Sequence, residues 1–108
     1  MRTTWNKKEF KAYLLLYCAN IDHEENQKEL KMIKSQITEE AYIKIHEEFE
    51  EDNDYQSIEK INHTVERLGY TKENIDYLIS QIKALFMVDG EFDATEQALF
   101  IGLKRILK

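Results

Sequence analysis

The chain has 108 residues, a formal net charge of −6 and a single cysteine. This length suits one domain that forms a core without disulfide or metal staples, and one cysteine excludes an internal disulfide. The negative charge argues against non-specific nucleic-acid binding, which depends on Lys and Arg neutralising phosphates, but it permits a cation or a basic partner. There is no signal-peptide pattern and no apolar run of the roughly 18 residues that a membrane span needs. We therefore expect a cytoplasmic protein without direct membrane insertion.

Apolar residues recur at helical spacing along nearly the whole chain, and no stretch alternates with period two for long enough to form a strand. We predict an all-α, compact bundle of about six helices in a single domain, residues 1–108. The first helix begins near Thr4 or Asn6, the second is short, and the third follows Thr38. Their predicted inward residues are Phe10, Tyr13, Leu14, Tyr17, Cys18 and Ile21, then Leu30, Ile33 and Ile37, then Ala41, Tyr42, Ile45 and Phe49.

Asn53 or Asp54 is expected to cap the fourth helix, which ends before Gly69. Thr71 then opens the fifth helix, and a sixth completes the bundle. The predicted inward residues of these helices are Tyr55, Ile58, Ile61, Val65 and Leu68, then Ile75, Leu78, Ile79, Ile82, Leu85 and Phe86, then Leu99, Leu103, Ile106 and Leu107.

The sequence shows no recognisable catalytic apparatus. Metalloprotease, nucleophile-elbow, phosphate-loop and dinucleotide-binding motifs are all missing, and His46 has no second histidine at the spacing a zinc helix requires. Cys18 lies on the apolar side of the first predicted helix, which favours a buried thiol over a nucleophile. These patterns predict a protein that is not an enzyme.

Two acidic segments of similar pattern lie at predicted helix-to-helix junctions, at residues 22–29 and 89–96. Each has Asp first, Glu third, Asn or Asp fifth and Glu eighth. Capping explains part of this pattern. Asn26 and Asp93 are good N-cap residues, and Glu29 and Glu96 three positions later complete capping boxes.

Capping explains the first position of each junction less readily. Asp22 and Asp89 fall at the C-terminal ends of helices, where a negative charge opposes the helix dipole. Each therefore needs a partner, which is either a backbone N–H in an Asx-turn or a cation. Oxygen ligands favour Ca²⁺ or Mg²⁺ over Zn²⁺. The spacing is not that of an EF-hand, because Gly90 is second in its junction and Phe100 occupies the twelfth position.

At these junctions the chain resembles the tellurite-resistance TerB-like family, which includes the N-terminal helical domain of DjlA-type co-chaperones. The family's turn reads Asp-Gly-x-apolar-(Ser/Thr/Asp)-x-x-Glu, and residues 89–96 fit that form closely. The first copy departs from it, because His23 replaces the glycine and Glu25 replaces the apolar residue. The resemblance implies a helical bundle with two related helix-turn-helix halves.

The family's acidic positions are implicated in metal binding, and similar domains occur beside membrane or stress-response partners. The resemblance therefore implies a divalent-cation site at four positions, with three further carboxylates as secondary candidates. The four are Asp22, Glu29, Asp89 and Glu96, and the secondary candidates are Glu24, Glu91 and Asp93.

A third acidic feature is a run of six carboxylates in the predicted third helix and the turn after it, namely Glu47, Glu48, Glu50, Glu51, Asp52 and Asp54. The run is either a solvated helix end or a docking surface for a basic protein partner, with a second cation locus as a further alternative. We expect Lys44, Lys60 or solvent to relieve the repulsion. His46 and Glu50, four residues apart, are expected to form a surface pair.

Taken together, these features predict a small cytoplasmic TerB-like adaptor that binds a divalent cation or is linked to a stress response. The alternative is a metal-free protein-interaction scaffold or co-chaperone accessory domain. A protein partner is expected and nucleic acid is not, and a homodimer is compatible with the pattern.

Overall fold

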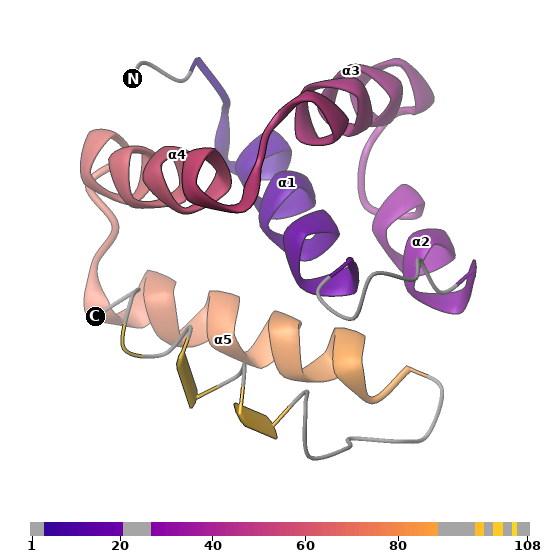
Figure 1. Cartoon of the computed structure of the whole chain (residues 1–108). Coiled ribbons are helices and arrows are strands. Elements are labelled where there is room, and N and C mark those ends of the chain that lie inside the picture. The colour runs from indigo at the N-terminus through magenta and orange to yellow at the C-terminus, as the bar shows by residue number, and fades with distance from the viewer. Residues whose placement is uncertain (1–3, 21–26, 89–96, 99–100, 103–104, 106–108) are drawn as a thin grey trace.

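The computed structural model describes residues 4–20, 27–88, 97–98, 101–102 and 105. This part of the chain is all-helical and contains no strand. Its five bounded helices are α1 (Lys7–Ala19), α2 (Gln27–Lys34), α3 (Glu39–Glu51), α4 (Asp54–Arg67) and α5 (Lys72–Phe86) (Figure 1). Residues 97–98, 101–102 and 105 are also helical. The complete sixth helix and the two related halves lie largely outside the described residues and stay predictions.

Side-chain caps determine where four of the helices begin. Asn6, Thr38, Asn53 and Thr71 precede α1, α3, α4 and α5, and each accepts a hydrogen bond from the backbone N–H three residues later. Three of these caps are reciprocal capping boxes, in which the third residue of the helix bonds back to the cap. Gly69 follows α4 with a φ of 64°, the left-handed conformation expected after a helix. The helix starts predicted from these residues are confirmed.

Helix α1 is the centre of the bundle, and each of the other four helices contacts it (Figure 1). Its buried residues lie on all sides of the helix, whereas the sequence predicted that only one face would be buried. They are Phe10, Ala12, Tyr13, Leu14, Leu15, Leu16, Cys18 and Ala19. The consecutive leucines are buried because α2, α3, α4 and α5 together surround α1.

The other helices each bury one face, as their periodicity predicted. The buried apolar residues on these faces are Leu30, Ile33, Tyr42, Ile45, Ile61, Leu78, Ile82, Leu85 and Phe86. Tyr55 is an exception, because its predicted inward side chain is 71% exposed in the first turn of α4. No helix in the described ranges is long and apolar enough to cross a bilayer.

Candidate functional site

Among the four primary metal candidates, Glu29 is the one that falls within the described ranges. It lies in the first turn of α2 and is 7% exposed. Asp22, Asp89 and Glu96 lie outside the described residues, as do the secondary candidates Glu24, Glu91 and Asp93. Within the part of the chain that is described, no three His, Cys, Asp or Glu residues gather in a metal-binding arrangement. The junction site therefore stays a prediction.

The Cys18 thiol is buried at the end of α1. Burial raises the pKa of Cys18, and the negative charge of Glu29 raises it further. A thiol with a raised pKa is protonated at neutral pH, so it is a poor nucleophile. The first junction therefore places a carboxylate near a neutral thiol.

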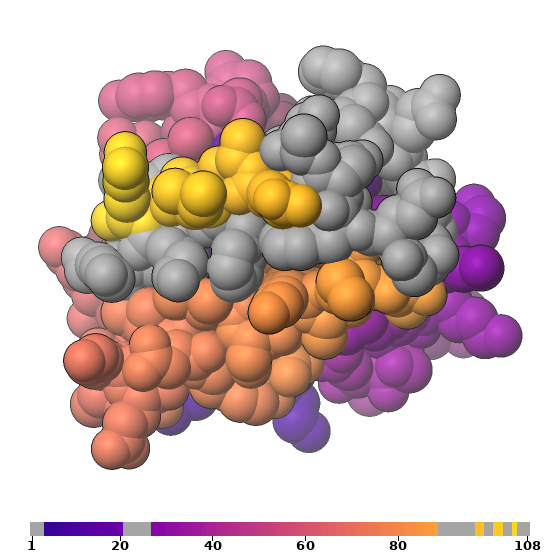
Figure 2. All heavy atoms as spheres, turned by 90° about the horizontal axis from the view of Figure 1, so that it is seen from below, coloured from indigo at the N-terminus to yellow at the C-terminus, as the bar shows by residue number. Residues whose placement is uncertain are grey.

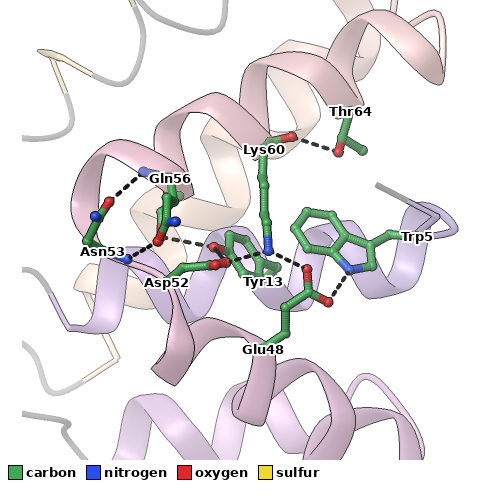
Figure 3. Close-up of polar contacts among 9 residues, drawn as sticks. Trp5, Tyr13, Glu48, Asp52, Asn53, Gln56, Lys60 and Thr64 are labelled. Carbon is green, nitrogen blue, oxygen red and sulfur yellow. Dashed lines mark hydrogen bonds and ion pairs between the residues drawn. The ribbon is translucent and has the colours of Figure 1, made fainter. Parts of the chain in front are cut away.

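The acidic run divides into an inward part and an outward part. Glu48 and Asp52 turn inward to the ammonium of Lys60, which lies 2.8 Å from Glu48 Oε2 and 2.7 Å from Asp52 Oδ2 (Figure 3). The Lys60 side chain is 13% exposed and that of Asp52 is 9% exposed. The predicted relief of repulsion by Lys60 thus takes the form of two shielded ion pairs.

Two aromatic side chains complete this arrangement from α1 and the residues before it. The Tyr13 hydroxyl donates to Asp52 Oδ2 at 2.6 Å, and Trp5 Nε1 donates to Glu48 Oε1 at 3.1 Å (Figure 3). Ser57 Oγ lies 2.9 Å from the Tyr13 oxygen. Because Tyr13 gives its proton to the carboxylate, we assign Ser57 as the donor in that pair. We call Trp5, Tyr13, Glu48, Asp52, Ser57 and Lys60 the polar network.

The network holds each titratable group in a defined charge state. Burial alone would lower the pKa of Lys60, but its hydrogen bonds with Asp52 and Glu48 outweigh that effect and raise it. Burial raises the pKa of Tyr13, as does its hydrogen bond to Asp52. At neutral pH Lys60 is therefore an ammonium and Tyr13 a neutral phenol. The network connects α1, α3 and α4.

The remaining carboxylates of the run face solvent. Glu47, Glu50, Glu51 and Asp54 are exposed. His46 Nε2 lies 3.5 Å from Glu50 Oε1, which is the expected surface pair, and Tyr17 donates a hydrogen bond to Asp54.

Two large apolar side chains in the same stretch of sequence are also exposed, Ile43 of α3 at 51% and Tyr55 of α4 at 71%. Ile43, Glu47 and Glu51 recur every four residues and so share one side of α3. We call Ile43, Glu47, Glu50, Glu51, Asp54 and Tyr55 the acidic face.

A groove between α1, α2 and α5 was not anticipated from the sequence. It encloses about 530 Å³ and combines an apolar floor with lysine and tyrosine side chains. The Nζ atom of Lys7 lies 5.8 Å from the centroid of the Tyr70 ring, and that of Lys11 donates to the Tyr77 hydroxyl at 2.9 Å. We call this feature the lysine–tyrosine groove. The basic residues near the N-terminus were a visible signal, but nothing in the sequence placed Tyr70 or Tyr77 beside them.

Comparisons with family models, with curated proteins and with solved structures gave no match to this chain. The TerB-like resemblance therefore rests on the two junction segments, and the arguments below rest on the described geometry.

Proposed function

We propose that this chain is a small, non-enzymatic adaptor that binds a basic protein partner through the acidic face. The observation that carries the proposal is the exposure of Ile43 on the same side of α3 as Glu47 and Glu51. Glu50, Asp54 and Tyr55 are also exposed at the end of that helix and the start of the next. Exposed apolar side chains supply contact area at interfaces, and a patch of one charge sign steers an oppositely charged partner toward it.

The use of the shielded polar groups supports a non-enzymatic role. General acids and bases act best when they are shielded and have shifted pKa values. Here the most shielded carboxylate of the acidic run, Asp52, is bonded to both Lys60 and Tyr13. Cys18 is buried and protonated. These groups hold the fold together, and the acidic face is left for recognition.

Charge reversal on the acidic face tests the proposal. The variant Glu47→Lys/Glu51→Lys should lose a partner that wild-type protein captures from a lysate of its own cells, measured by quantitative mass spectrometry. The matched control is Glu73→Lys/Asp76→Lys, which makes the same charge change at exposed positions of α5. Circular dichroism should show that both variants fold. An unchanged set of captured proteins with the acidic-face variant would contradict the proposal.

We further propose that the junctions regulate this adaptor by binding Ca²⁺ or Mg²⁺ through Asp22, Glu29, Asp89 and Glu96. The repeated spacing of Asp, Glu, Asn or Asp, and Glu in the two junctions supports this proposal, and Glu29 in the first turn of α2 is the candidate ligand that the structure describes. The start of α2 also offers backbone N–H groups and a favourable dipole. The competing function is a metal-free scaffold or co-chaperone accessory, in which Glu29 only stabilises the helix start.

Titration of chelator-stripped protein with Ca²⁺, Mg²⁺ and Zn²⁺ separates these two functions. A regulatory site with a Kd of roughly 10⁻⁴ to 10⁻³ M should give saturable amide NMR shifts at residues 22–29 and 89–96. It should also raise the thermal midpoint as the ion concentration exceeds Kd. Asp89→Asn should abolish both effects. Flat titrations with all three ions at millimolar concentration would leave the metal-free scaffold.

A further inference from the structure

The lysine–tyrosine groove lies on another side of α1 from the polar network and takes no part in the function proposed above. Side chains of α1 emerge beneath α5 at the lower edge of Figure 2, on the side away from the C-terminal residues. We propose that this groove binds a small amphipathic carboxylate that also carries an N–H or O–H donor, the chemistry of an N-acyl amino acid. This proposal does not rest on the adaptor function.

The size and floor of the groove indicate a small organic ligand. Its volume of about 530 Å³ is within the range of small-molecule sites, which are concave, mostly apolar and supplied with a few polar groups. The apolar floor comes from α1, from α5 and from α2 with the residues that follow it. Its members are Ala12, Leu15, Ile33, Ile37 and Leu78. An acyl chain of six to ten carbons is the kind of body that such a floor would cover.

The rim of the groove indicates that the ligand is an anion. Lys7, Lys8 and Lys11 line it, and no carboxylate is among its described lining residues. Within the described ranges no ion pair engages any of these lysines. Lys11 uses one N–H on Tyr77 and keeps two for a ligand, since an ammonium has three donors. A cluster of unpaired lysines on a chain of net charge −6 is a local site for negative charge.

A third feature specifies a hydrogen-bond donor on the ligand. Gln36 lines the same groove, and its Oε1 atom is buried without a hydrogen-bond partner among the described residues. Buried acceptors are almost always paired, so a donor brought into the groove could satisfy this oxygen after a small turn of the Gln36 side chain. An amide N–H between an acyl chain and a carboxylate supplies that donor.

The gathering of the polar and apolar groups at one place favours a small molecule over a peptide. A helical peptide needs anchors along two or more turns, and a peptide that adds a strand needs a free sheet edge. The groove instead gathers its apolar, cationic and acceptor groups around one cavity where three helices approach one another.

Three related probes test the proposal by amide NMR titration of the full chain. N-octanoylglycine has the carboxylate, the donor and the acyl chain. N-octanoylglycinamide lacks the charge, and octanoate lacks the amide donor. N-octanoylglycine should give saturable shifts at Leu15, Ile33 and Leu78, and each of the other two should bind roughly tenfold more weakly, the loss expected for one charged or one buried hydrogen bond.

Variants of the groove residues show which side chain is responsible for each loss of affinity. Lys7→Met/Lys11→Met should weaken N-octanoylglycine roughly tenfold and leave N-octanoylglycinamide unchanged, because it removes only the partners of the carboxylate. Gln36→Met should weaken both amides and leave octanoate unchanged. Lys44→Met/Lys83→Met, at exposed positions of α3 and α5, is the matched charge control and should change nothing.

The proposal is overturned if none of the probes gives saturable groove shifts up to about 5 mM, a concentration that detects even millimolar affinity. It is also overturned if the charged and neutral amides bind equally, since nonspecific uptake of the chain would then explain the binding. Groove shifts on dilution without ligand would instead assign the groove to a second copy of this chain. Groove shifts with a short leucine–glutamate peptide, and not with N-octanoylglycine, would assign it to a protein partner.

Discussion

Polar side chains are paired with one another on one side of α1, whereas on the other side they line a groove. On the side of α3 and α4, Lys60, Asp52 and Tyr13 satisfy one another at distances of 2.6 to 2.7 Å. On the side of α2 and α5, three lysines line a groove without a carboxylate, and the buried oxygen of Gln36 has no partner among the described residues. Buried polar groups that are fully paired stabilise a structure, whereas unpaired ones mark a place for a ligand or water. The comparison suggests a division of roles, in which the polar network stabilises the fold and the lysine–tyrosine groove is available for a ligand.

Removal of Lys60 should have the largest effect. Lys60→Met leaves Asp52 and Glu48 as neighbouring shielded carboxylates without their cation, and we expect a loss of about 3 kcal/mol in the free energy of unfolding. Urea unfolding followed by circular dichroism measures it. Lys72→Met, at an exposed position of α5, is the control. A loss below about 1 kcal/mol would place this network among ordinary surface ion pairs.

Alkaline pH should have the second-largest effect, because it removes protons from Tyr13, Tyr17 and Lys60. Folding raises the pKa of Tyr13 and Tyr17 above the ordinary 10.0, and that of Lys60 above 10.5. The folded state then holds protons that the unfolded state releases, so the stability that these groups contribute is fully present below about pH 9. It is lost as the pH rises above about 10, by up to about 1.4 kcal/mol per pH unit for each group that stays protonated in the folded state.

Denaturant midpoints between pH 7 and 11 measure this slope. Tyr13→Phe should flatten the slope by the contribution of one group, and Tyr77→Phe, at the exposed rim of the groove, is the control. A slope that is the same in wild type and in Tyr13→Phe would contradict the assignment.

At neutral pH, Tyr13→Phe should cost about 1 kcal/mol. It removes a hydroxyl that donates to Asp52 and accepts from Ser57, but Lys60 still compensates the carboxylate. Tyr55→Phe changes an exposed hydroxyl and should be nearly neutral. Chemical unfolding of both variants provides the comparison, and equal stabilities would mean that the Tyr13 hydroxyl adds nothing to the network.

In the lysine–tyrosine groove, removal of a polar group should not lower the free energy of unfolding. Gln36→Met removes a buried acceptor that has no partner among the described residues, so the free energy of unfolding should stay unchanged or rise by up to about 1 kcal/mol. Gln56→Met is the matched control and should be destabilising, because Gln56 completes the capping box of α4. A clear loss of stability in Gln36→Met would show that its oxygen is paired in solution.

Local features of this fold were predictable from sequence because they depend on neighbouring residues. The caps at Asn6, Thr38 and Asn53 follow from side chains that bond to the backbone three positions later. The burial of α1 on all sides was not predictable from its own periodicity, because it depends on four helices that come later in the chain. The all-helical class followed from periodicity alone.

The functional sites were likewise predictable only where their residues lie close together in the sequence. The partnership of Lys60 with the acidic run was anticipated because Lys60 lies only 12 residues after Glu48 and still closer to Asp52 in the sequence. The bonds from Trp5 and Tyr13 were missed, although a buried indole or phenol needs a partner and that rule was an available signal. The groove was missed because Lys11 and Tyr77 are 66 residues apart. The junction ligands Asp22, Asp89 and Glu96 stay predictions, since they lie outside the described residues.

The enclosure of α1 has a consequence for synthesis on the ribosome. Residues 14–16 are three consecutive leucines, yet the last of the described helices that contact α1 ends at Phe86, 70 residues after Leu16. At bacterial or eukaryotic elongation rates, α1 waits roughly 3 to 13 seconds for the residues that bury it. During that interval its apolar surface is open to chaperones, so the rate of translation becomes part of how this chain reaches its fold.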